Sequence, residues 1–195
     1  MPDAYPYSAA NISIAAVKHD LHTLLALMLS EKEITRLVQP SETDENQAII
    51  SDDATRKHLI ISAILRTAVT FRYLDDYKEY GKKARVFSKQ DECGNLWTYI
   101  DNKKSGDKSL LPRDACNKII HSNGFFFLPQ ENEGESTADY ALLSFKIKIF
   151  NTHQATDNSS KVPRHRWEAE LDLIKFTQAC HRALSKFESH HSDVC

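Results

Sequence analysis

Glycine is scarce in this chain, with 5 among 195 residues, and no glycine-rich phosphate-binding loop is present. Long apolar runs are missing too, because no stretch approaches the roughly 20 apolar residues of a membrane-spanning helix. The N-terminal segment MPDAYPY lacks both the basic start and the apolar core of a secretory signal. These absences predict a cytoplasmic protein that is neither exported nor inserted into a membrane.

Paired cysteines and a strong charge of one sign are also lacking. Cys93, Cys116, Cys180 and Cys195 form no Cys-x-x-Cys pair, which is typical of reduced thiols and not of a disulfide framework or a zinc site. The 25 basic side chains nearly balance the 27 acidic ones. Without an overall field, binding to nucleic acid would require a local basic patch. We expect no metal and no cofactor.

What the sequence does contain is the composition of an ordinary globular domain. Apolar residues make up 41% and charged residues 27% of the chain, and 195 residues suffice for one well-buried core. We therefore predict a single helical domain over residues 1–195, with a β insert at about 124–171.

Four segments carry the apolar spacing of three and four residues that is typical of amphipathic helices. They cover about 11–38, 51–81, 109–123 and 172–187. The first two are joined by a short polar link and should pack antiparallel. Ser51 is the expected cap of the second helix and Asp172 that of the fourth.

Three segments before the last helix are predicted to be strands: the first is a short apolar run, and the other two alternate apolar with polar residues, which predicts one apolar and one charged face. They lie at 125–128, 144–149 and 166–171. If the last two pair, Lys146 and Lys148 can face two glutamates, Glu168 and Glu170. Residues 82–108 are ambiguous, and segments 84–87 and 96–100 could pair there as a hairpin.

The third predicted helix carries a polar stripe formed by Arg113, Asn117 and His121, which follow one another at intervals of four residues. One interpretation is a solvated face whose polar residues lie near a helix end. The other is a catalytic site, because the pKa of histidine lies near neutrality and suits a general acid or base. These three residues are the candidate catalytic residues.

Residues 116–121, Cys-Asn-Lys-Ile-Ile-His, resemble the Arg-Asn-x-x-x-His signature of the HEPN superfamily. The resemblance implies a four-helix bundle that forms a homodimer, with arginine and histidine from both chains in a metal-independent ribonuclease site. In this sequence Cys116 replaces the signature arginine. The nearest upstream arginine, Arg113, lies eight residues before His121, which is about 12 Å along a helix axis.

The predicted fold is mainly α (α+β): a four-helix HEPN-like bundle with a three-stranded antiparallel sheet inserted before the last helix. Because the signature arginine is missing, we favour a non-catalytic dimerisation or partner-binding module, as in bacterial defence or toxin–antitoxin systems. The alternative is a ribonuclease with His121 as acid or base, Asn117 as polar support and Arg113 as phosphate clamp. The expected partners are a second copy of the chain, and RNA or another protein.

Three further features favour ordinary structure over a site. His19 and His22 could share a metal but lack further ligands, so an exposed helix face is the favoured interpretation. Asp75 and the aspartate that follows it are expected to solvate a helix end. Residues 164–166 are basic and could grip single-stranded RNA beside Trp167, but that ring is expected to face the core.

Overall fold

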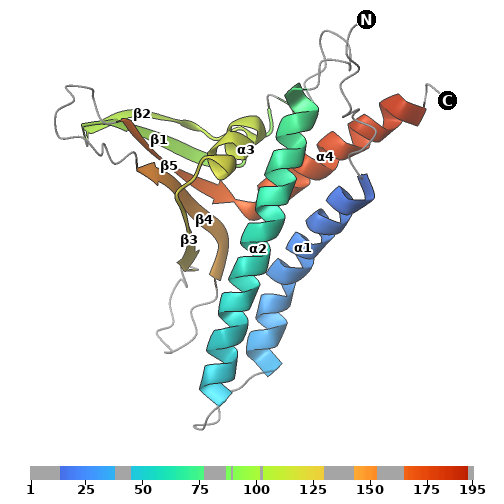
Figure 1. Ribbon diagram of the computed structural model, residues 1–195, viewed down its shortest axis with the longest axis vertical. Helices are drawn as coiled ribbons and strands as arrows, with labels where there is room; N and C mark the ends of the chain where they lie inside the picture. Colours follow the sequence, from blue (N-terminus) through green and yellow to red (C-terminus); the bar gives the residue numbers. More distant parts are fainter. Residues whose placement is uncertain are drawn as a thin grey trace, which may run out of the picture.

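The computed structural model describes residues 14–37, 45–76, 87–88, 90–101, 103–129, 143–152 and 165–192. Four helices and five strands follow one another in this part of the chain (Figure 1). They are α1 (Ile14–Leu37), α2 (Glu45–Asp76), β1 (Gly94–Ile100), β2 (Lys103–Ser109), α3 (Pro112–Ile120), β3 (Gly124–Pro129), β4 (Leu143–Thr152), β5 (His165–Asp172) and α4 (Leu173–Ser192).

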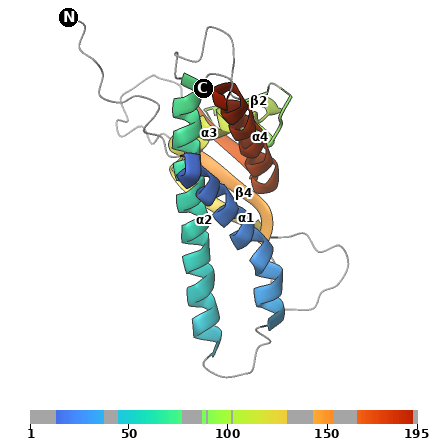
Figure 2. The same cartoon turned by 90° about the vertical axis from the view of Figure 1, so that its right-hand side faces the viewer.

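The helices are stacked in layers on one face of the sheet (Figures 1 and 2). Helices α3 and α4 contact the sheet, α2 packs on α3, and α1 packs between α2 and α4. Alternate residues of the strands point into this core and are at most 2% exposed. They are Leu96, Ile147, Ile149, Ala169 and Leu171. The two long helices run antiparallel, as predicted.

The predicted fold class is wrong, because the protein is not a mainly helical bundle with a three-stranded sheet. All five strands of the described sheet pair antiparallel, in the order β2-β1-β5-β4-β3. The three predicted strands are present as β3, β4 and β5. However, β5 is the middle strand and β1 and β2 extend the sheet on its other side.

The error has a physical reason in the composition of β2. Its sequence, KKSGDKS, contains no apolar residue and therefore lacks the alternation that marks a strand. Backbone pairing with β1 holds it in place. The hairpin considered for 84–87 and 96–100 does not form, since 96–100 lies in β1 and pairs with β2 and β5. Residues 84–86 lie outside the described part.

The contact expected between the last two strands is confirmed. The Lys146 and Lys148 ammonium groups lie 3.1 and 2.7 Å from the carboxylates of Glu170 and Glu168. Close pairing of β1 with β5 also explains Gly94, whose φ is +150°. A Cβ atom there would collide with the carbonyl oxygen of Glu170, so only glycine fits.

The helix boundaries are partly confirmed. Helix α4 begins as predicted, since Asp172 Oδ1 accepts a hydrogen bond of 2.9 Å from the backbone N–H of Lys175. Helix α3 has Pro112 in its first turn. Helix α2 begins at Glu45 and not at Ser51, so Ser51 is not its cap. None of the described helices combines the length and the apolar character needed to cross a membrane.

Candidate functional site

Helix α3 carries all three candidate catalytic residues and connects β2 to β3. One side of the helix is buried against α2, α4 and the sheet, through Ala115, Cys116 and Ile119, each 0% exposed. Arg113 and Asn117 lie on the half-buried side, and His121 is the exposed residue that ends the helix. The polar stripe predicted from the sequence is therefore present.

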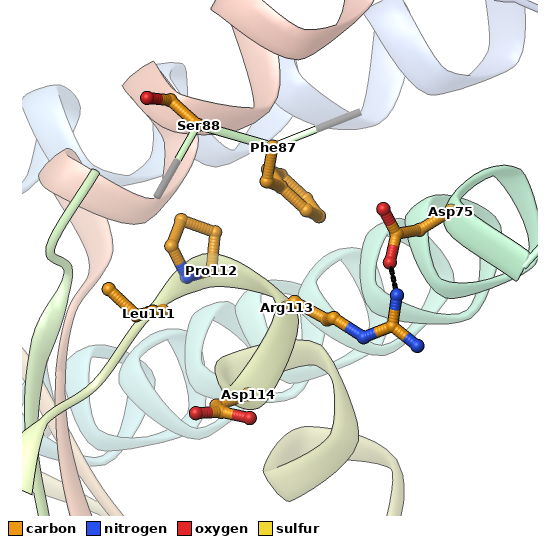
Figure 3. A pocket seen from close by; sticks show the side chains of 7 residues that line it. All are labelled: Asp75, Phe87, Ser88, Leu111, Pro112, Arg113 and Asp114. Atoms are coloured by element: carbon orange, nitrogen blue, oxygen red, sulfur yellow. Dashed lines mark hydrogen bonds and ion pairs between the residues drawn. The ribbon is translucent and has the colours of Figure 1, made fainter. Parts of the chain in front are cut away.

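Arg113 lies at the first turn of α3, and its guanidinium contacts the carboxylate of Asp75 on α2 (Figure 3). The Asp75 side chain is only 1% exposed, so the expectation that it solvates a helix end is wrong. A charge at this depth is stable only with a cation and hydrogen bonds beside it. Arg113 thus has a structural task, which is to neutralise a buried carboxylate between α2 and α3.

A small cavity of about 140 Å³ adjoins this ion pair. It is lined by Asp75, Phe87, Ser88, Leu111, Pro112, Arg113 and Asp114 (Figure 3). Asp114 is paired with Lys108 at 3.2 Å. The guanidinium of Arg113 at the edge of this cavity is already paired with a carboxylate of the same chain.

His121 lies at the opposite end of α3. Its backbone N–H donates to the carbonyl of Asn117 at 3.1 Å, and its own carbonyl accepts a hydrogen bond of 2.7 Å from Asn151 Nδ2 on β4. The residue is exposed, and no described residue forms a hydrogen bond with its imidazole. The side chain can therefore reach a ligand from solvent.

The structure brings His121 together with Asn117 and Asn151 but not with Arg113. Within one chain, Arg113 and His121 occupy opposite ends of the helix. Cys116 points into the core, and burial raises the pKa of its thiol to about 12. An arginine at position 116 would therefore lie inside the protein and not at a surface site.

Two other expectations are confirmed by the packing. Trp167 packs against the core, and the Lys118 ammonium lies 4.4 Å from the centre of its ring. Partial burial lowers the pKa of Lys118.

His19 and His22 are exposed on α1, where His22 stacks on His181 with 5.8 Å between ring centres. No cluster of three or more metal-ligating side chains occurs in the described residues.

The cysteines of the described part are buried as free thiols. Cys93, Cys116 and Cys180 are each 0% exposed. The Cys93 thiol donates to the carbonyl of Leu110 at 3.2 Å. Burial raises the pKa of Cys180 well above its usual value, so this thiol behaves as a small apolar group.

Strand β3 is a feature whose role the sequence did not reveal. It forms one edge of the sheet and, in the described part, pairs only with β4. None of the residues of its sequence, GFFFLP, is charged. Phe125 and Phe127 pack on the core, whereas Phe126 points the other way and is 60% exposed. The uncharged run was visible in the sequence, but its position at an edge was not.

No family model, no curated protein and no solved structure matches this chain. What the candidate surfaces can do therefore follows from their geometry and chemistry.

Proposed function

We propose that this chain is a non-catalytic dimerisation module that pairs with a second copy through β3. The observation that carries the proposal is an uncharged edge strand with a large exposed aromatic side chain at its centre. Unpaired edge strands offer a row of backbone donors and acceptors to another chain. Antiparallel pairing of two β3 strands would join the two sheets into one.

A strand that pairs with its own copy across a two-fold axis must be self-complementary, because each residue meets a symmetry-related one. Charged residues near the axis would face like charges, which destabilises a strand pair. Strand β3 has none. Pro129 ends the ladder, since it has no backbone N–H, and this favours an axis near Phe126.

In this register Phe126 lies opposite Phe126 of the second copy, and Phe125 lies opposite Phe127. Cross-strand aromatic pairs contribute about 0.2–1 kcal/mol each. Burying a phenylalanine that is 60% exposed adds roughly 1–2 kcal/mol per copy. Together with the new backbone hydrogen bonds, these contributions suit a specific dimer.

The lack of catalysis is supported by the arrangement of α3. The guanidinium of Arg113 is bound to Asp75, and position 116 faces the core. Neither position can place a cation beside His121 in the same chain. Catalysis by His121 would therefore need an arginine or lysine from elsewhere.

The test is the mass of the protein in solution, measured by light scattering across a concentration series. The natural chain should be a dimer, and Phe126→Lys should make it a monomer because two lysines would meet at the axis. Leu29→Lys is the matched control, since Leu29 is 62% exposed on α1 and lies outside the proposed interface. A monomeric natural chain, or a Phe126→Lys protein that stays dimeric, would overturn the proposal.

A metal-independent ribonuclease is the second candidate, and one observation favours it. His121 is exposed with Asn117 one turn earlier on the same helix, so an acid or base could act on a bound ribose hydroxyl. This candidate predicts cleavage of single-stranded RNA in the presence of a chelator. His121→Ala should abolish the cleavage, and the control His19→Ala should cleave as the natural chain does. If no preparation cleaves RNA, the ribonuclease candidate fails and the dimerisation proposal is unaffected.

A further inference from the structure

Helices α1 and α2 enclose an open groove of about 450 Å³ between the first half of α1 and the second half of α2. The two helices lie side by side in both views (Figures 1 and 2). The groove is lined by Ala16, Val17, Asp20, Leu65, Arg66, Val69 and Thr70. It is mainly apolar, and its polar groups are concentrated in the pair of Asp20 and Arg66.

Besides the apolar line that it buries in the core, helix α2 carries a second line of residues in which exposed apolar side chains flank a serine and an arginine. This line, called the outer line here, consists of Leu59, Ser62, Arg66, Val69 and Tyr73. Its leucine, valine and tyrosine are 45%, 54% and 37% exposed. Single exposed apolar residues are common on protein surfaces, but these three lie on one face of the helix with Ser62 and Arg66, and the five positions follow one another at steps of three and four residues. That spacing is the one by which a helix contacts another helix over several turns.

Arg66 stands in the middle of the outer line and is held in a fixed orientation. Its Nε lies 3.1 and 3.0 Å from the two carboxylate oxygens of Asp20, and its Nη2 lies 2.7 Å from one of them. The hydrogen bonds to Asp20 raise the pKa of Arg66, so the guanidinium stays charged. Asp20 is only 9% exposed, whereas the Arg66 side chain is 59% exposed.

The charge presented to a ligand is consequently the guanidinium and not the carboxylate beneath it. Nη1 of Arg66 forms no hydrogen bond with any described residue. An incoming carboxylate could therefore pair with this nitrogen without displacing Asp20, and a hydrogen bond between charged groups is stronger than a neutral one. A cation in the same place would be repelled.

We propose that the groove between α1 and α2 binds an amphipathic helix that carries one carboxylate among its apolar residues. The outer line extends over 15 residues from Leu59 to Tyr73, a rise of about 21 Å, which matches a helix better than a small molecule. A helix crossing at about 20° would keep contact with every member of the line. A second copy of α2 fits poorly, because it would place one Arg66 against another.

The proposal does not depend on the dimer, since β3 takes no part in the groove. The probe for the groove is a fluorescein-labelled synthetic helix of 21 residues, with leucine at the a and d positions of each heptad and one central glutamate. A second peptide has lysine in place of that glutamate and is otherwise identical. Binding is measured by fluorescence anisotropy and the contact residues by NMR chemical-shift changes.

The glutamate peptide should bind with a dissociation constant of roughly 100 µM or tighter, and about five-fold more tightly than the lysine peptide. Arg66→Gln should remove this preference, and Val69→Lys should weaken both peptides. Circular dichroism checks that both variants fold, which is expected because Val69 is exposed and because a glutamine amide can still donate a hydrogen bond to the Asp20 carboxylate. The monomeric Phe126→Lys protein should bind as well as the natural chain.

Failure of the glutamate peptide to bind would overturn the proposal. So would equal affinity for both peptides, or a preference for glutamate that survives Arg66→Gln. Chemical-shift changes confined to residues outside α1 and α2 would also overturn it.

Discussion

The two edge strands of the sheet differ in the property that governs whether an edge attracts another strand. In β2, four of seven residues are charged, and Lys104 lies 2.7 Å from Asp107 in an ion pair. In β3, none of six residues is charged, and Phe126 is 60% exposed. Natural proteins protect edge strands with charges, above all with lysine. The comparison indicates that one edge repels other chains and that the other is suited to binding one.

The same contrast extends to α3, which joins the two edges. Its end beside β2 is anchored to α2 through Arg113 and Asp75. Its end beside β3 is held through Asn151 and leaves the His121 side chain in solvent. We therefore expect Arg113, at the end beside β2, to contribute more to folding than His121, at the end beside β3.

The largest effect on folding is expected for Arg113→Met, which removes the guanidinium that faces the buried Asp75 carboxylate. The free energy of unfolding should fall by about 3 kcal/mol, because a buried carboxylate loses the guanidinium that contacts it. Urea denaturation measures the change. Lys108→Ala is the matched control, since its pair with Asp114 is exposed and should contribute at most about 1 kcal/mol. A loss as small in Arg113→Met as in Lys108→Ala would contradict the structural role of Arg113.

A second prediction concerns the charges that protect β2. Replacing Lys103, Lys104 and Lys108 by threonine should turn β2 into an edge that also associates. The self-association constant should rise roughly ten-fold, or about 1.4 kcal/mol, and species larger than a dimer should form. Light scattering at increasing concentration detects them. If the variant keeps the mass of the natural chain at every concentration, the lysines do not protect this edge.

A smaller effect is expected for Asn151→Ala, which removes the hydrogen bond to the carbonyl of His121. Loss of this part-buried hydrogen bond should cost about 1 kcal/mol of stability. Thermal or urea unfolding measures the loss, with the exposed residue Asn95 on β1 replaced by alanine as the control. Equal stability of the two variants would show that Asn151 does not hold this end of α3.

The smallest effect on stability is expected for His121→Ala. The side chain is exposed and forms no hydrogen bond with a described residue, so the free energy of unfolding should change by less than about 0.5 kcal/mol. The dimer mass should be unchanged. A loss of more than 1 kcal/mol in urea denaturation would reveal a packing role that the structure does not contain.

Local patterns explain which parts of the fold could be predicted from the sequence. Strands β4 and β5 and helices α1, α3 and α4 carry periodic apolar residues, β3 is a short apolar run, and Asp172 is a good cap. Strand β2 was not predicted, because it is polar on both faces and has no alternation of apolar and polar residues. The pairing of β1 with β5 was not predicted either, because the two strands lie about 70 residues apart in the chain and no local pattern specifies such a contact.

For the candidate site, too, the sequence predicted the local arrangement on one helix but not the contacts between elements. The spacing of Arg113, Asn117 and His121 correctly indicated one stripe on α3. It could not indicate that Arg113 would bind Asp75, 38 residues earlier in the chain, because that contact depends on how α2 and α3 pack. The groove at Arg66 likewise exists only once α1 lies beside α2.

The most direct test of self-pairing through β3 is a disulfide across the proposed two-fold axis. Phe126→Cys, made together with Cys195→Ser, should form a cross-linked dimer on mild oxidation, since opposed residues in an antiparallel pair lie about 4.5–5.5 Å apart, within reach of a disulfide. Leu59→Cys in the same background, which is 45% exposed on α2, should remain largely uncross-linked. Rapid, nearly complete cross-linking of Phe126→Cys alone is the predicted result. No cross-link at Phe126→Cys, or equal cross-linking of both variants, would contradict the proposed dimer.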